Sequence, residues 1–180
     1  MPLADQPLAT LLAQIAAATP APGGGSTAGV ACALAAALVE MSAGPPHERA
    51  AKLQARALEL AENDLSSYAR VLEAERLPAE DATRPERVRA ALSAASDTPL
   101  AIAEVGCEVA ELGAEIARGA RVHVEGDAAT AALLAEAATR AAARLVELNL
   151  AGVPDDVRLR TAGEYASRAR AARSDAARES

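Results

Sequence analysis

The sequence predicts an all-α protein, an up-and-down bundle of five to six helices with a buried apolar helix at its centre. Alanine supplies more than a quarter of the 180 residues, a composition typical of helical proteins. Apolar residues recur at helical spacing between breaks that contain glycine and proline. No segment is rich in strand-forming residues. A chain of this length is expected to form one domain, residues 1–180.

Three helices are expected in the first half of the chain. Leucine and isoleucine at helical spacing predict the first helix over 3–18. The second, 25–43, is apolar on all faces, which favours a position at the centre of the bundle. Gly44-Pro45-Pro46 ends it. The third helix, 47–76, carries an apolar stripe that also includes Asp64.

The second half predicts three more helices. Pro85 is well placed in the first turn of a helix that runs to about 118. A bend or restart is expected at Asp97-Thr98-Pro99, because proline disfavours the helical conformation in the residue before it. A loop then leads to a fifth helix over 127–150, and an amphipathic helix over 155–173 completes the bundle.

Composition also narrows the class of protein. The chain has no Phe or Trp, so small residues must let helices approach closely, and a homodimer is expected to compensate for a thin core.

The formal net charge of −7, without a Lys/Arg cluster, argues against nucleic-acid binding. No basic residue precedes Arg49, which disfavours a signal peptide, and the apolar stretch 27–39 is short for a bilayer. Cys32 and Cys107 lack metal-type spacing and are expected as buried hydrophobes. A cytoplasmic protein without a membrane partner is therefore predicted.

A glycine-rich turn is the clearest functional signal. Pro20-Ala21-Pro22 leads into Gly23, Gly24, Gly25 and Ser26 immediately before the apolar helix. The first N–H groups of a helix lack intrahelical partners and carry partial positive charge. The turn is therefore a candidate site for a polar or anionic ligand, although many such turns serve only tight packing.

Two acidic residues occupy apolar surroundings in the first half. Glu40 is the only charged residue between Asp5 and His47, so it faces water near the helix end, pairs with a cation or lines a site. Asp64 lies on a core-facing stripe with Tyr68 one turn further on. A carboxylate there is either satisfied by local partners or part of a polar pocket.

Further candidates lie around the fifth helix. Asp127 could be a simple helix N-cap or a functional acid. Asn149 lies among leucines and either links helices or contacts a ligand. His123, in the preceding loop, could transfer protons near neutral pH, although most lone loop histidines have no chemical role. The chain has no nucleophile motif, no metal-ligand constellation and no P-loop lysine.

Several motifs together resemble the cyclodeaminase/methenyltetrahydrofolate cyclohydrolase family, which includes the C-terminal domain of formiminotransferase-cyclodeaminase. The matching segments are PAPGGGSTAGVACALAAALVEM, DLSSYARVLEAERLP at 64–78, TPLAIAE at 98–104, and Gly126-Asp127 with the helix that follows. The resemblance covers most of the chain.

The resemblance implies a folate one-carbon enzyme without a metal or bound cofactor, whose substrate is a tetrahydrofolate derivative. Such an enzyme hydrolyses 5,10-methenyltetrahydrofolate to the 10-formyl form, or cyclises 5-formiminotetrahydrofolate with release of ammonia. The lack of an attached formiminotransferase domain favours the first reaction. The alternative is a non-catalytic helical dimer that retains the fold.

The residue roles that follow are also expectations. Asp64 and Asp127 are the predicted catalytic residues, and one or the other is expected to move the proton. The predicted substrate-binding residues are Gly23, Gly24, Gly25, Ser26, Glu40, Tyr68 and Asn149. These groups are expected to converge on one polar cleft across a subunit boundary.

Overall fold

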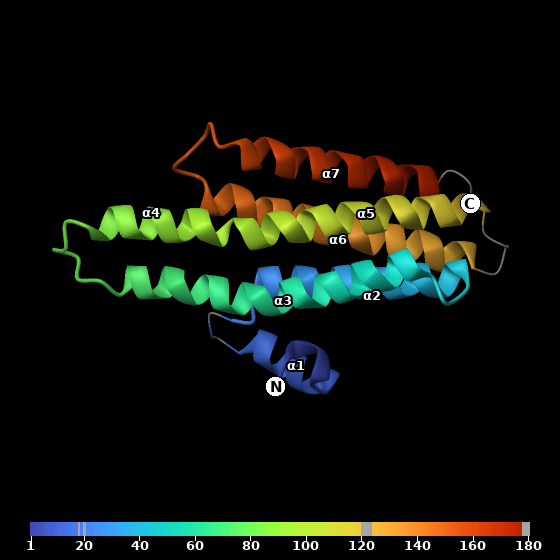
Figure 1. Ribbon diagram of the computed structural model, residues 1–180, viewed down its shortest axis with the longest axis horizontal. Coiled ribbons are helices and arrows are strands. Elements are labelled where there is room, and N and C mark those ends of the chain that lie inside the picture. The colour runs from blue at the N-terminus through green and yellow to red at the C-terminus, as the bar shows by residue number, and fades with distance from the viewer. Residues whose placement is uncertain (18, 20, 120–123, 178–180) are drawn as a thin grey trace.

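The structure, a computed structural model, describes residues 1–17, 19, 21–119 and 124–177 as a bundle of helices. Over these residues it contains one short 3-10 helix, η1, and seven α-helices (Figure 1). Their bounds are η1 Leu3–Asp5, α1 Leu8–Ala16, α2 Gly24–Ala43, α3 Glu48–Glu75, α4 Arg84–Ala95, α5 Asp97–Gly119, α6 Glu125–Asn149 and α7 Val157–Ala176. The long helices run up and down one axis, with α7 and α1 on opposite outer sides.

The all-α prediction is confirmed, and most helix ends lie close to those expected. The bend predicted at 97–99 is a break at Ser96, which separates α4 from α5. His47 caps α3, since its Nδ1 accepts the Ala50 N–H at 3.2 Å. The single first helix over 3–18 is wrong. Pro7 separates η1 from α1, because proline lacks the N–H that a continuous helix requires.

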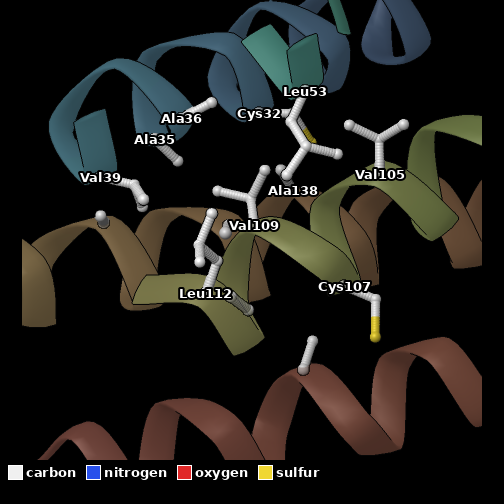
Figure 2. Close-up of a cluster of buried hydrophobic side chains, with 14 of the residues drawn as sticks. Cys32, Ala35, Ala36, Val39, Leu53, Val105, Cys107, Val109, Leu112 and Ala138 are labelled. Carbon is white, nitrogen blue, oxygen red and sulfur yellow. The ribbon is translucent and has the colours of Figure 1, made fainter. Parts of the chain in front are cut away.

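The core lies where α2, α3, α5, α6 and α7 meet, and it is built of small aliphatic residues. Figure 2 shows side chains from α2, α3 and α5 pointing toward one another, with Cys107 turned toward α7. Both cysteines are free and buried, as the sequence predicts. Burial raises the pKa of the Cys32 thiol to about 12 and that of Cys107 to about 11.

Helix α2 combines a buried side with an exposed one. Cys32, Ala36 and Val39 are fully buried against α3, α5 and α6, whereas Leu34 is 57% exposed. By length and composition α2 could cross a membrane, but half of its apolar window is buried inside the bundle. Helix α2 is longer than the apolar stretch 27–39. The argument from the sequence that this stretch is too short to cross a bilayer therefore does not apply to the whole helix. A buried core helix has the same properties.

Gly106 of α5 lies at a close contact between three helices, α2, α5 and α6. A Cβ built there would lie 2.5 Å from Thr139 Oγ1 of α6 and 3.0 Å from Cys32 Sγ of α2. Thr139 is fully buried, and its hydroxyl donates to the Ala135 carbonyl at 2.8 Å, so it has little freedom to move. The absence of a side chain at Gly106 therefore allows α2, α5 and α6 to pack together.

We predict that Gly106→Ala lowers the free energy of unfolding by about 1–3 kcal/mol, because the added methyl group overpacks this contact. Gly163→Ala is the matched control, since Gly163 lies within α7 with nothing near its missing Cβ. That change should raise stability by up to about 1 kcal/mol through helix propensity. Urea unfolding measures both. Equal effects of the two substitutions would contradict the packing argument.

Candidate active site

A polar pocket of about 250 Å³ lies beside the start of α2 and the end of α6. Four segments of the chain form its walls: the start of α2, the middle of α3, the α4–α5 junction and the last turns of α6. The lining residues are Ala21, Gly23, Gly24, Gly25, Asp64, Ser67, Tyr68, Ala95, Pro99, Leu145 and Asn149. This set is called the polar pocket below.

The Asp64 carboxylate is the charged group of the polar pocket. Its Oδ2 accepts the backbone N–H of Ser26 at 2.8 Å and the Ser26 hydroxyl at 3.0 Å. Ser26 is the third residue of α2, so Asp64 satisfies one of the helix N–H groups that lack an intrahelical partner. Both bonds end on Oδ2, which leaves Oδ1 outside this pair.

Burial raises the pKa of Asp64 above its usual value of 3.8, and the two hydrogen bonds from Ser26 oppose that rise in part. The carboxyl group thus holds its proton to higher pH than an exposed aspartate does. A carboxyl group with a raised pKa in a pocket is a candidate general acid or base.

Gly25 makes the contact between α2 and Asp64 possible. A Cβ at Gly25 would overlap the Asp64 carboxylate, whereas one at Gly24 would only touch Leu145 at 3.8 Å. The glycine at 25 is therefore required for close approach. Gly24 lines the pocket without this constraint.

Another wall of the polar pocket is the junction between α4 and α5. Asn149 Nδ2 donates to the carbonyl of Ala95, the last residue of α4, at 3.4 Å. The hydroxyls of Ser67 on α3 and Thr98 on α5 lie 3.1 Å apart and share a hydrogen bond. Side chains from α3 and α6 thus hold this wall on its inner side.

Six of the nine predicted site residues line the polar pocket. They are Gly23, Gly24, Gly25, Asp64, Tyr68 and Asn149. Ser26 has a different place from the one expected, because it is buried and gives its N–H and its hydroxyl to Asp64. The start of α2 is therefore occupied by a carboxylate of the protein itself. In this structure Ser26 acts on the pocket through Asp64.

Asp127 and Glu40 lie away from the polar pocket of their own chain. Asp127 is in the first turn of α6 and Asn149 is its last residue, about 33 Å further along a helix that rises 1.5 Å per residue. Glu40 is near the end of α2, about 24 Å from Gly24 by the same measure. Asp127 is also not an N-cap residue, since α6 begins at Glu125. His123 lies outside the described residues.

Sequence reasoning missed Ser67, Ala95, Pro99 and Leu145 as pocket residues. Ser67 could have been found, because it follows Asp64 by three residues and so shares its helix face. Ala95 and Leu145 are small or apolar residues without a chemical signature. Among the residues that the structure describes, no group of three His, Cys, Asp or Glu side chains could hold a metal ion.

We predict that Gly25→Ala lowers the free energy of unfolding by about 1–3 kcal/mol, because displacing Asp64 leaves buried polar groups without their partners. Gly24→Ala, one residue away, should change it by less than about 0.5 kcal/mol. Chemical denaturation of both variants measures the difference. Comparable stabilities would mean that Asp64 moves aside at no cost.

Comparisons with known proteins extend this picture. The sequence model of the formiminotransferase-cyclodeaminase family matches residues 7–44 and 46–168. Methenyltetrahydrofolate cyclohydrolase from Methylorubrum extorquens is 31% identical, over 84% of this chain and 82% of that protein. A crystal structure of formiminotetrahydrofolate cyclodeaminase from Thermotoga maritima has the same fold, with a TM-score of 0.84 over 96% of this chain and 94% of that chain at 20% identity. This chain belongs to the formiminotransferase-cyclodeaminase family.

Proposed function

We propose that this protein is a folate one-carbon enzyme that hydrolyses 5,10-methenyltetrahydrofolate to 10-formyltetrahydrofolate. The relative from Methylorubrum extorquens, a methenyltetrahydrofolate cyclohydrolase by name, supports this reaction. The observation that carries the proposal is the partly buried Asp64 carboxylate, with its raised pKa, in a pocket formed by four segments of the chain. A tetrahydrofolate derivative is the substrate, and no bound cofactor is proposed.

In the proposed mechanism Asp64 is the base. The substrate carries a positive charge on its methenyl bridge, which a nearby carboxylate attracts. Asp64 removes a proton from a water molecule, and the oxygen of that water bonds to the bridge carbon. The result is a tetrahedral carbon between N5 and N10. Asp64 returns this proton to N5 as the bond from the carbon to N5 breaks, and the hydroxyl group on the carbon loses its proton to water to become the carbonyl of the 10-formyl product. Ser26 holds the carboxylate in place through both of its hydrogen bonds.

Other lining residues are proposed to bind the substrate. Asn149 keeps an amide oxygen and one N–H beyond its bond to Ala95, and Tyr68 supplies an aromatic ring and a hydroxyl. The pocket volume of about 250 Å³ lies below the range of roughly 300–1,000 Å³ typical of sites for drug-sized ligands. We therefore place only part of the folate inside it, with the remainder along its mouth.

We predict that Asp64→Asn lowers kcat by about 10²–10⁴-fold, the usual contribution of a positioned general base. Asparagine still accepts a hydrogen bond from Ser26, so the fold should persist. With wild-type protein the rate should fall as the pH is lowered through the raised pKa of Asp64, because the protonated carboxyl cannot accept a proton. Loss of methenyltetrahydrofolate absorbance measures turnover.

The matched control is Glu59→Gln, a carboxylate on the same helix that is exposed and pairs with Arg56. It should leave turnover unchanged. Full activity of Asp64→Asn would refute the role of Asp64. Ammonia release from 5-formiminotetrahydrofolate is measured alongside, because the family also includes cyclodeaminases. Wild-type protein without either activity and without folate binding would favour the non-catalytic dimer.

We further propose that the protein is a homodimer built on the face of α2 and α6. An apolar groove of about 570 Å³ runs along this face and shares Gly23 and Gly24 with the polar pocket. Leu34 of α2 and Leu133 of α6, next to the groove, are about half exposed, as is Met41 further along α2. Exposed apolar area of this kind is typical of an interaction surface.

A two-fold axis that lies in the interface plane, perpendicular to the long axes of α2 and α6, would account for the placement of Asp127 and Glu40. The polar pocket lies at one end of α2 and α6, and these two residues lie toward the opposite ends of the same helices. Rotation about the axis brings the far end of one copy opposite the pocket of its partner. Asp127 and Glu40 would then reach the partner's pocket rather than their own.

We predict that mixing Asp64→Asn with Asp127→Asn protein, after dissociation and reassociation, recovers activity that neither variant has alone. A mixed dimer would contain one site with both aspartates intact. Analytical ultracentrifugation should show a dimer for the wild type and a monomer for Leu34→Asp, since a charge at the interface opposes association. A fully active Asp127→Asn protein would remove Asp127 from the mechanism.

A further inference from the structure

Arg158, near the start of α7, makes the densest set of side-chain hydrogen bonds around the α4–α5 junction. A guanidinium group has five N–H donors in a fixed plane, and here five bonds use them. Nη1 donates to the Ser93 carbonyl and to Asp97 Oδ1, both at 2.7 Å. Nη2 donates to Ser93 Oγ at 2.7 Å and to Asp156 Oδ2 at 2.8 Å, and Nε donates to Asp156 Oδ1 at 3.0 Å.

These bonds join three helix ends. Ser93 lies in the last turn of α4, where carbonyl groups lack intrahelical partners, and Asp97 is the first residue of α5. Asp156 is the N-cap of α7 and also accepts the backbone N–H of Arg158 at 3.0 Å. One side chain therefore fixes the end of α4 and the start of α5 relative to α7.

Two side chains of this hydrogen-bond network, those of Arg158 and Asp156, are largely shielded from water. The Arg158 side chain is 20% exposed and that of Asp156 is 17% exposed, whereas Asp97 is 70% exposed. The hydrogen bonds with Arg158 lower the pKa of Asp156 to about 2, and those with Asp156 raise the pKa of the guanidinium group. Asp156 and Arg158 therefore both stay ionised across the pH range in which an enzyme works.

The α4–α5 junction that Arg158 holds is also a wall of the polar pocket. Ala95 and Pro99 line the pocket, and they lie within a few residues of Ser93 and Asp97. The Ala95 carbonyl accepts the Asn149 amide, and Thr98 bonds to Ser67. The junction is thus held by Asn149 and Ser67 on the pocket side and by Arg158 on the other.

We propose that Arg158 is a positioning residue of this site, which sets where Ala95, Pro99 and the amide of Asn149 lie against the substrate. Arg158 does not line the pocket, so it acts through the junction. Asp64 belongs to α3 and takes its hydrogen bonds from α2, so it does not depend on Arg158. Substrate binding should therefore change more than the chemical step. This role rests on the proposed function.

The test compares Arg158→Gln with Arg168→Gln. Arg168 also joins α7 to α5, through two bonds to Glu111 at 2.9 and 3.0 Å, but it lies away from the polar pocket. Both variants lose one positive charge and one link between the same two helices. With both proteins fully folded, well below their melting temperatures, Arg158→Gln should raise KM for methenyltetrahydrofolate about tenfold and change kcat less than about threefold. Arg168→Gln should leave both constants unchanged.

Two further variants give graded effects. Arg158→Lys keeps the charge but cannot span three partners in one plane, so its KM should lie between those of wild type and Arg158→Gln. Ser93→Ala removes a single bond to Nη2 and should raise KM by about two- to threefold. Ser93→Ala also tests the proposal if the Arg158→Gln protein does not fold. A wild-type KM in both Arg158→Lys and Ser93→Ala would overturn the proposal.

Amide hydrogen exchange without ligand separates this proposal from the proposed function. Exchange over residues 93–100 and 145–149 should be faster in Arg158→Gln than in Arg168→Gln. That result would show that Arg158 holds the pocket wall even if the wild type neither turned over nor bound folate, an outcome that would refute the proposed function and with it the effect on KM. Equal exchange in the two variants would overturn the role of Arg158.

Discussion

The contact between Asp64 of α3 and Ser26 at the start of α2 is the interaction on which the candidate site depends. A carboxylate that is partly buried requires hydrogen-bond donors, and the start of a helix has N–H groups that require acceptors. The two needs are met together because Gly25 carries no side chain at the point of contact. The contact thus caps α2 and at the same time fixes the one charged group among the described residues that line the polar pocket.

The same close packing extends through the core. Without phenylalanine or tryptophan, helices fill space by approaching closely, as α2, α5 and α6 do around Gly106. Close approach leaves little freedom for side chains and fixes the relative positions of the helices. A rigid bundle is a suitable support for a site whose walls come from four separate segments.

The two sides of the polar pocket have different chemical characters. The side formed by α2 and α3 holds the carboxylate, and we assign the proton transfer to it. The side formed by the α4–α5 junction and α6 presents an amide and apolar groups, and we assign substrate binding to it together with Tyr68 of α3. Helix α7 does not line the pocket, yet through Arg158 it holds the second side in place.

The sequence alone determined the helices and the chemical character of the site. Helix ends followed from proline, glycine and apolar spacing, and Asp64 with Tyr68 on one helix face pointed to a pocket because residues four apart on a helix are neighbours. The first helix was the exception, since Pro7 breaks it.

Only the tertiary structure decided which of these groups meet. It places Asn149 at the pocket and Asp127 at the opposite end of the same helix, and it turns Ser26 toward Asp64. It also makes Arg158 a link between three helix ends. Such contacts depend on how separate helices pack, and local spacing carries no information about that.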